Sequence, residues 1–287
     1  MGGSMKLIGI DLDGTLLNSQ KEISKENIEA LKSIANNDQY YVFICSGRPA
    51  FNIKNILDKY DLDLPFVGTN GALAYDGDKI IFDFPFDKQV SINVYETIKD
   101  HAFLAYNKSE RYGEKCHLEK LEKLFKISED YLTEDELNSF KNYRKGIIKD
   151  NLREFDDFYE LLDKEDFQIF KFFMYMPILE RKQKIQEQLS KVDGIYTTES
   201  ERTNIEIVAK NVNKGMVFKH LEKYLNLEKS TRIAIGDSLN DLEMFKMADY
   251  SFAMENAYDE IKDIATHVVT TNDKNGVAEA IEIIKRL

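Results

Sequence analysis

The sequence has only two cysteines, Cys45 and Cys116, among 287 residues. Two cysteines so far apart provide neither a disulfide framework nor the ligand set of a structural zinc site. Long apolar runs are missing as well, since no segment reaches the roughly 18 to 20 uninterrupted apolar residues of a membrane span. The first residues lack the apolar segment of a secretory signal, so a cytoplasmic protein without a membrane partner is expected. Residues 1–4 are interpreted as an addition left by expression, with Met5 as the natural start.

The sequence has fewer basic than acidic residues, with 39 Lys and Arg against 51 Asp and Glu, so the formal net charge is −12. Such a chain repels nucleic acid backbones and anionic lipid surfaces, so neither is expected as a partner. A local basic pocket can still bind a small phosphorylated metabolite. Apolar residues make up 43% of the chain, which suffices for the cores of one large domain or two ordinary ones. The sequence does not decide between a monomer and a homodimer.

The two ends of the chain alternate apolar strands with amphipathic helices. The first strands are expected at 6–11, in "YYVFICSGRP" and in "FVGTNGA", separated by helices at about 24–37, with Ser24 as N-cap, and 50–60. The last strands are expected in "RIAIGD", "DYSFAM" and "HVVTT", again separated by helices. Continuous apolar strands alternating with helices are typical of a parallel sheet covered on both faces. We predict an α/β fold whose doubly wound, mostly parallel, Rossmann-like sheet is formed by residues 1–84 and 210–287.

Residues 85–209 have a different pattern. The strand candidates there, "FLAYN", "FQIFKFFMYM", "GIYTTE" and "TNIEIVA", lack Gly-rich turns after them. Helices are expected at "LEKLEKLF" (118–125) and "LREFDDFYELLDKE" (152–165). The acidic runs of this region are interpreted as solvated helix faces. The segment is predicted to be an inserted α+β cap domain.

Polar residues gather at four places in the two end segments. These are "DLDGT" at 11–15, "SGRP" at 46–49, "NKG" at 213–215 and "GDSLND" at 236–241. Three of them directly follow an apolar strand. In a doubly wound sheet, ligands bind beyond the carboxyl ends of the strands, near the point where the strand order reverses. Four carboxylates are therefore expected to converge there: Asp11, Asp13, Asp237 and Asp241.

Carboxylates brought together repel one another, so a cation is required among them. Because the set has hard oxygen ligands and neither His nor Cys, it favours Mg²⁺ over zinc. The Ser46 hydroxyl, the amides of the turn at Gly47 and the Lys214 ammonium can bind phosphoryl oxygens. One carboxylate then remains free to attack phosphorus, as in aspartyl-phosphate chemistry. The pattern predicts a magnesium-dependent phosphoryl-transfer site.

In their order along the chain, the four clusters resemble the four motifs of the haloacid dehalogenase (HAD) superfamily of phosphatases. "TNGA" at 69–72 resembles a turn of its Cof-type branch, and the insert between the second and third motifs resembles a C2 cap of the C2B kind. The resemblance spans essentially the whole chain. It implies Mg²⁺-dependent hydrolysis of a small phosphorylated metabolite, such as a sugar phosphate, through an aspartyl-phosphate intermediate.

The resemblance also implies a role for each site residue. Asp11 matches the nucleophile and a metal ligand, and Asp13 matches the general acid and base, with its backbone carbonyl on the metal. Asp237 and Asp241 match the remaining metal positions, although Asp241 can instead contact the residues that bind the metal. The phosphate-binding positions are matched by Ser46, Gly47, Lys214 and Asn240. Arg48, Asn70 and Gly71 are candidates for positioning the substrate, and Arg48 can instead brace its loop by pairing with an acid.

Two other functions remain open at this point. A phosphomutase of the same fold would use Asp11 and Asp13 to move phosphate between positions of a sugar. A non-catalytic binding protein could retain the fold, although both of these aspartates are present. The cap sets the substrate, and the sequence does not identify it.

Overall fold

The computed structural model describes residues 5–128, 131–149 and 152–287, so the addition predicted at residues 1–4 lies outside the described residues. The chain divides into two compact units. The discontinuous unit comprises Met1–Asp83 and Val212–Leu287, and the inserted unit comprises Phe84–Asn211. Their assignment as catalytic core and cap stays a prediction. Within the described ranges, every helix is too short or too polar to traverse a lipid bilayer.

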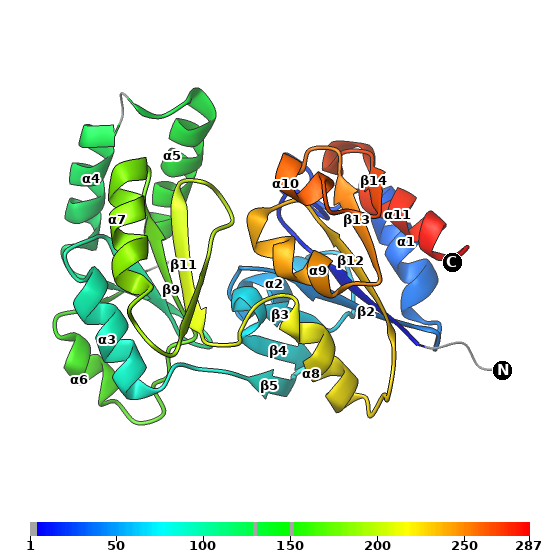
Figure 1. The fold of residues 1–287 in the computed structure, drawn as a ribbon, viewed down its shortest axis with the longest axis horizontal. Coiled ribbons are helices and arrows are strands. Elements are labelled where there is room, and N and C mark those ends of the chain that lie inside the picture. Colours follow the sequence, from blue (N-terminus) through cyan, green and yellow to red (C-terminus); the bar gives the residue numbers. More distant parts are fainter. Residues whose placement is uncertain (1–4, 129–130, 150–151) are drawn as a thin grey trace. The chain divides into compact units, whose positions relative to one another are not determined.

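The discontinuous unit is built on an eight-stranded sheet in the order β14-β13-β12-β1-β2-β3-β4-β5 (Figure 1). The strands are β1 (Lys6–Ile10), β2 (Tyr40–Cys45), β3 (Phe66–Gly68), β4 (Leu73–Asp76), β5 (Lys79–Asp83), β12 (Thr231–Gly236), β13 (Tyr250–Met254) and β14 (His267–Val269). Neighbours from β14 to β3 pair in parallel, whereas β4 and β5 form an antiparallel edge. The register aligns Ile8 with Ile233 on one side and with Val42 on the other. The predicted doubly wound, mostly parallel sheet is confirmed.

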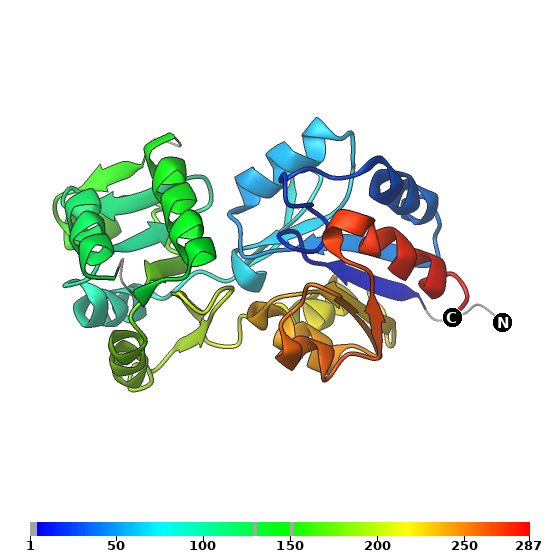
Figure 2. The same cartoon turned by 90° about the horizontal axis from the view of Figure 1, so that it is seen from above.

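Helices cover both faces of this sheet, each through one apolar stripe. They are α1 (Lys25–Ala35), α2 (Ala50–Lys59), α8 (Met216–Tyr224), α9 (Leu242–Met247), α10 (Asp259–Lys262) and α11 (Gly276–Ile284), with the short 3₁₀ helices η1 (Thr69–Gly71), η3 (Leu239–Asp241) and η4 (Asn272–Lys274). The Ser24 side chain accepts a hydrogen bond from the Asn27 amide, which confirms the predicted N-cap of α1. α1 packs against α11 on one face of the sheet, and α8 and α9 lie on the other (Figure 2).

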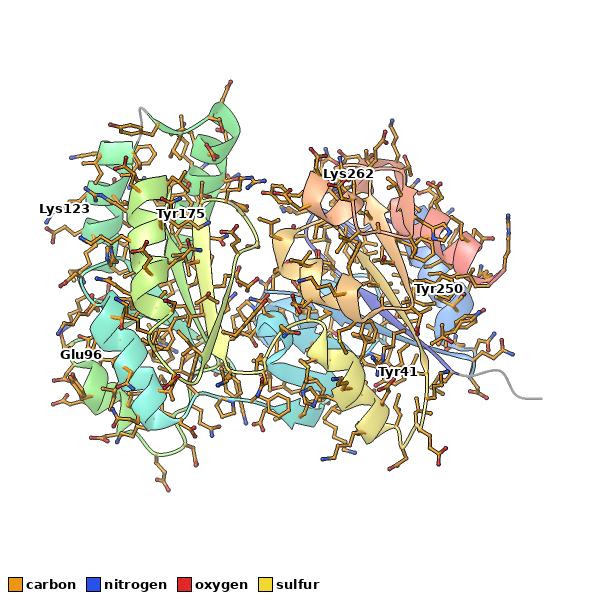
Figure 3. The ribbon with its side chains drawn as sticks, viewed as in Figure 1. Tyr41, Glu96, Lys123, Tyr175, Tyr250 and Lys262 are labelled. Atoms are coloured by element: carbon orange, nitrogen blue, oxygen red, sulfur yellow. The ribbon has the colours of Figure 1, made fainter. Side chains whose placement is uncertain are left out.

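The inserted unit has a six-stranded sheet in the order β10-β11-β9-β6-β7-β8. Its elements are α3 (Lys88–Ile98), β6 (Phe103–Tyr106), β7 (Arg111–Glu114), α4 (His117–Ser128), α5 (Glu134–Lys149), β8 (Arg153–Phe155), α6 (Phe158–Leu162), β9 (Lys171–Tyr175), α7 (Leu179–Leu189), β10 (Ile195–Thr198) and β11 (Asn204–Ala209). α3, α6 and α7 share one core with the sheet, and α4 and α5 share a second core with it. Tyr175 lies in the second core, whereas Glu96 and Lys123 point outward from their helices (Figure 3).

One predicted helix of this unit, at residues 152–165, is wrong in its first part. Arg153–Phe155 forms β8, because it pairs in parallel with β7 and buries Phe155. α6 begins only after Asp157, whose side chain accepts hydrogen bonds from the amides of Tyr159 and Glu160. The strands predicted in "FLAYN", "FQIFKFFMYM", "GIYTTE" and "TNIEIVA" are confirmed as β6, β9, β10 and β11.

Candidate active site

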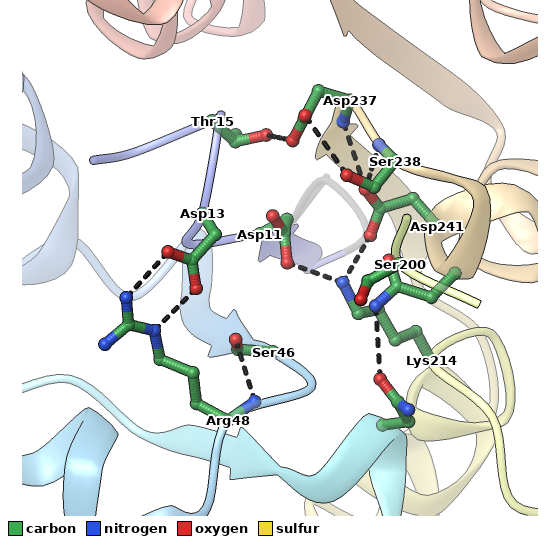
Figure 4. A network of polar contacts seen from close by, with 12 residues as sticks. Asp11, Asp13, Thr15, Ser46, Arg48, Ser200, Lys214, Asp237, Ser238 and Asp241 are labelled. Carbon is green, nitrogen blue, oxygen red and sulfur yellow. Dashed lines mark hydrogen bonds and ion pairs between the residues drawn. The ribbon is translucent and has the colours of Figure 1, made fainter. Parts of the chain in front are cut away.

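Three neighbouring strands of the discontinuous unit, β12, β1 and β2, end at the same edge of the sheet, and polar residues follow each of them. Asp237 follows β12, Asp11 follows β1 and Ser46 follows β2. The amide of Asp11 extends the strand ladder by donating to the carbonyl of Ile235 at 2.9 Å. Figure 4 shows Lys214 bonded to Asp11 and Asp241, with Asp237 next to Asp241. The structure therefore brings together residues from three of the four polar clusters here, with Ser46 of the fourth close by.

Lys214 joins two of the carboxylates, and its side chain is fully buried. Its ammonium donates to Oδ1 of Asp11 at 2.5 Å and to Oδ1 of Asp241 at 2.6 Å. Burial alone would lower the pKa of Lys214, but the charges of Asp11 and Asp241 raise it above its usual value. Lys214 is therefore a permanent positive charge in the site.

The carboxylates of Asp11, Asp237 and Asp241 form a compact acidic cluster. Each is buried, and each offers an oxygen within 4.8 Å of the others. Burial raises the pKa of Asp11, and the Asp241 and Asp237 charges add to this rise while Lys214 opposes it. Burial, followed by the charge of Asp241, raises the pKa of Asp237 to about 7. Since one ammonium does not balance three carboxylates, this oxygen-rich cluster fits a hard divalent cation.

Hydroxyl and amide groups fix the direction of these carboxylates. Thr15 donates to Oδ1 of Asp237 at 2.7 Å, and Ser238 donates to Oδ2 at 3.1 Å. Oδ2 of Asp241 accepts from the amides of Asp237 at 3.0 Å and Ser238 at 2.9 Å. Because Oδ1 of Asp241 binds Lys214, both of its oxygens are engaged within the protein. These contacts fix the orientation of Asp241, and whether it binds the metal directly or holds the direct ligands stays a prediction.

Asp13 is turned toward Arg48 and away from this cluster (Figure 4). Arg48 donates to both carboxylate oxygens of Asp13, from Nε at 2.5 Å and from Nη2 at 2.6 Å, and its Nη1 donates to Asn52 at 2.6 Å. Lys21 adds a contact of 2.9 Å from Nζ to Oδ1. Burial would raise the pKa of Asp13, but Arg48 and then Lys21 hold it well below its usual range. Of the two roles considered for Arg48, the structure shows the pairing with an acid.

The predicted phosphate-binding residues lie on separate loops of the discontinuous unit. Ser46 is buried, and its Oγ accepts a hydrogen bond from the amide of Arg48 at 3.2 Å. Asn240 donates to Oδ1 of Asn70 at 3.2 Å. The amide of Asn70 in turn donates to the carbonyl of Ser46 at 3.1 Å, so these loops are connected through η1. Gly71 is the last residue of η1.

Sequence reasoning gave no role to several side chains that the structure places here. Thr15 lies in "DLDGT" and Ser238 in "GDSLND". Their hydroxyl groups could have indicated that they hydrogen-bond a neighbouring carboxylate. Asn256 donates to the carbonyl of Gly14 at 2.8 Å. Neither Asn256 nor Lys21 carries a local signal, because each reaches the site from a loop whose position depends on the completed fold.

Comparison with known proteins decides the family. A family model described as haloacid dehalogenase-like hydrolase matches residues 8–281. The chain belongs to the haloacid dehalogenase-like hydrolase family. One relative, the 5-amino-6-(5-phospho-D-ribitylamino)uracil phosphatase YwtE of Bacillus subtilis, is 33% identical over 97% of each chain. Another Bacillus subtilis phosphatase with the same described substrate, YcsE, is 27% identical over 96% of this chain and 94% of its own.

Solved structures of the haloacid dehalogenase-like family share this fold. The structure of a haloacid dehalogenase-like hydrolase from B. subtilis superposes with a TM-score of 0.82 at 27% identity, covering 97% of this chain and 99% of the other. The predicted fold class and the predicted enzyme class, a Cof-type phosphatase of this family, are confirmed. The roles of individual residues stay predictions.

Proposed function

We propose that the chain hydrolyses a small phosphomonoester with the help of Mg²⁺, through an aspartyl-phosphate formed on Asp11. The observation that carries this proposal is the buried cluster of Asp11, Asp237 and Asp241, in which Asp11 and Asp241 bind the Lys214 ammonium. Asp11 and Asp237, together with the backbone carbonyl of Asp13, would hold the metal. Bound Mg²⁺ supplies positive charge that offsets the repulsion between a carboxylate nucleophile and a phosphate dianion.

In the first step, a carboxylate oxygen of Asp11 forms a bond to phosphorus, and the bond from phosphorus to the ester oxygen breaks. Asp13 gives a proton to the leaving oxygen. In the second step, Asp13 takes a proton from water, the water oxygen attacks phosphorus, and the bond to Asp11 breaks. Lys214 and Ser46 bind phosphoryl oxygens in both steps. The products are an alcohol and inorganic phosphate.

Acid catalysis by Asp13 requires its ion pair with Arg48 to open. Arg48 engages both carboxylate oxygens and stabilises the ionised form of Asp13. A carboxylate held in this way has no proton to give to a leaving group. We infer that Asp13 turns from Arg48 toward the ester oxygen when substrate binds.

The inserted unit is proposed to act as the cap that selects the substrate. Its described residues contain none of the four motif clusters, and it joins the discontinuous unit at Asp83–Phe84 and Asn211–Val212. A domain on two such links can bind the non-reacting part of a substrate and exclude water during the reaction. The relatives YwtE and YcsE suggest 5-amino-6-(5-phospho-D-ribitylamino)uracil as the first candidate substrate. Sugar phosphates, flavin mononucleotide and pyridoxal phosphate are the competing candidates.

A panel of these esters, scored for released phosphate, tests the function. We expect release in Mg²⁺ and none in excess chelator, with the highest kcat/KM for the ribitylaminouracil ester. Full turnover in chelator would refute the metal requirement. An isomeric phosphosugar without free phosphate would show a phosphomutase, and binding without any turnover by the intact chain would show a non-catalytic protein.

A further inference from the structure

The turn formed by Thr69, Asn70 and Gly71, between β3 and β4, has an unusual backbone. The φ angle is +51° at Thr69, +58° at Asn70 and +105° at Gly71. Positive φ is uncommon for residues other than glycine, and for a β-branched residue such as Thr it is an outlier. Thr69 and Asn70 are also buried. Backbones in such states persist only where the surroundings hold them, and they cluster at functional sites.

This turn is bonded to the loop that carries Ser46. The amide of Thr69 donates to the carbonyl of Arg48 at 2.9 Å, and the amide of Asn70 donates to the carbonyl of Ser46 at 3.1 Å. Gly68, just before the turn, permits this approach, since a Cβ there would lie 2.9 Å from the Arg48 carbonyl oxygen. The positive φ angles therefore aim two successive amides at the phosphate-binding loop.

The same turn contacts two more segments of the site. A Cβ at Gly71 would lie 2.6 Å from the carbonyl oxygen of Asn213, the residue before Lys214. Oδ1 of Asn70 accepts the hydrogen bond from Nδ2 of Asn240. Three consecutive residues thus contact the segments that carry Ser46, Lys214 and Asn240, which are far apart in the sequence.

Two buried polar atoms at this junction, Oγ1 of Thr69 and Oδ1 of Asn240, have no hydrogen-bond partner among the described residues. Buried polar atoms without partners reduce stability and are rare. A strained turn that also leaves polar atoms unpaired is poorly explained by stability alone. Its contacts with three parts of the site offer the alternative explanation.

We propose that Asn70 is a positioning residue for phosphoryl transfer. Its backbone holds the Ser46 loop, and its side-chain amide orients Asn240 toward the phosphoryl group. This inference rests on the proposed function of the site. It changes the role expected for Asn70, which acts through Asn240 without touching the substrate.

The test separates the effect of the Asn70 side-chain amide from the effect of its backbone conformation. Asn70→Gly removes the amide and suits the positive φ, whereas Asn70→Ala also strains the backbone. Asn226→Gly is the matched control, because Asn226 also has a positive φ of 54° and is exposed. For p-nitrophenyl phosphate, assayed well below the melting temperature of each variant, we expect Asn70→Gly to lower kcat/KM by about 10- to 100-fold, as for other misplaced site groups. Asn226→Gly should keep wild-type kinetics.

Two further measurements distinguish positioning from a merely structural role. The inhibition constant of inorganic phosphate should rise in Asn70→Gly, because phosphate itself needs a correctly oriented Asn240. In an Asn240→Ala background, Asn70→Gly should have little further effect, since both changes remove one interaction.

Wild-type kcat/KM and phosphate inhibition in Asn70→Gly would overturn the inference while leaving the proposed function intact. Independent losses that multiply in the double variant would overturn the route through Asn240. A wild-type protein that releases no phosphate from any ester would overturn the proposed function, and the role of Asn70 with it.

Discussion

Alanine at Gly14 should weaken Mg²⁺ binding, because the new Cβ meets a proposed metal ligand. Gly14 has a φ of +78°, and a Cβ there would lie 2.3 Å from Oδ2 of Asp237. Ordinary contacts begin at 3.4 Å, so the Asp237 carboxylate must move by about 1 Å. Gly77 provides a matched control, since its φ is +57° and a Cβ there would meet nothing within 4 Å. Both substitutions carry a similar backbone cost, on the order of 1–2 kcal/mol.

The difference between the two variants isolates the displacement of Asp237. Moving a group that orients or binds a metal typically lowers metal affinity by about 10- to 100-fold. For Gly14→Ala this corresponds to roughly 1.4–2.8 kcal/mol of binding free energy. Gly77→Ala should bind Mg²⁺ as the wild type does, although its stability also falls.

Calorimetric titration of Mg²⁺ into the three proteins measures this difference without relying on turnover. Circular dichroism of each variant first establishes that the fold is intact. Equal Mg²⁺ affinities for Gly14→Ala and Gly77→Ala would refute the assignment of Asp237 as a metal ligand.

Three further predictions concern charges and protons. Lys214→Met leaves the Asp11 and Asp241 carboxylates buried without their cation, so in chelator it should lower the free energy of unfolding by about 3–5 kcal/mol in urea titrations; a loss below about 1 kcal/mol would contradict the pairing. Asp13→Asn should slow turnover and let phosphoenzyme accumulate, detectable by mass spectrometry of quenched protein, whereas wild-type rates would exclude Asp13 as the acid and base. Burial lowers the pKa of His117 from 6.5 to about 4. As pH falls, His117 is therefore protonated in the unfolded chain before it is protonated in the folded protein. This difference should lower the free energy of unfolding by about 2 kcal/mol between pH 7 and pH 5. In urea unfolding, His117→Phe should lose correspondingly less free energy of unfolding over the same pH range.

The parallel part of the sheet could be predicted because β1, β2 and β12 are continuous apolar runs that end in polar turns. The antiparallel edge β4–β5 was not predicted, since both strands are short, β5 is partly exposed, and their pairing is irregular between Ala74 and Tyr75. The dipeptide Asp76-Gly77 is typical of a tight hairpin turn and could have predicted this pair of strands. At residues 153–155 the apolar spacing suited a helix, and only the pairing with β7 made the segment a strand.

The convergence of Asp11 and Asp237 followed from a general rule about strand ends, which needs no side-chain detail. The orientation of Asp13 could not be predicted in the same way. It depends on where the Arg48 guanidinium lies after the second strand and its helix have packed. Local sequence identifies which residues carry chemistry, whereas the pairing among them is set by contacts distant in the chain.

The central claim is that Asp11 is the nucleophile of a Mg²⁺-dependent phosphatase. The most direct measurement is the rate of phosphate release from p-nitrophenyl phosphate by the wild type and by Asp11→Asn, both in Mg²⁺ and with matching circular dichroism spectra. Loss of a nucleophile should lower kcat by about 10⁴-fold or more, because no covalent path remains. A near-native rate for Asp11→Asn would contradict the aspartyl-phosphate mechanism.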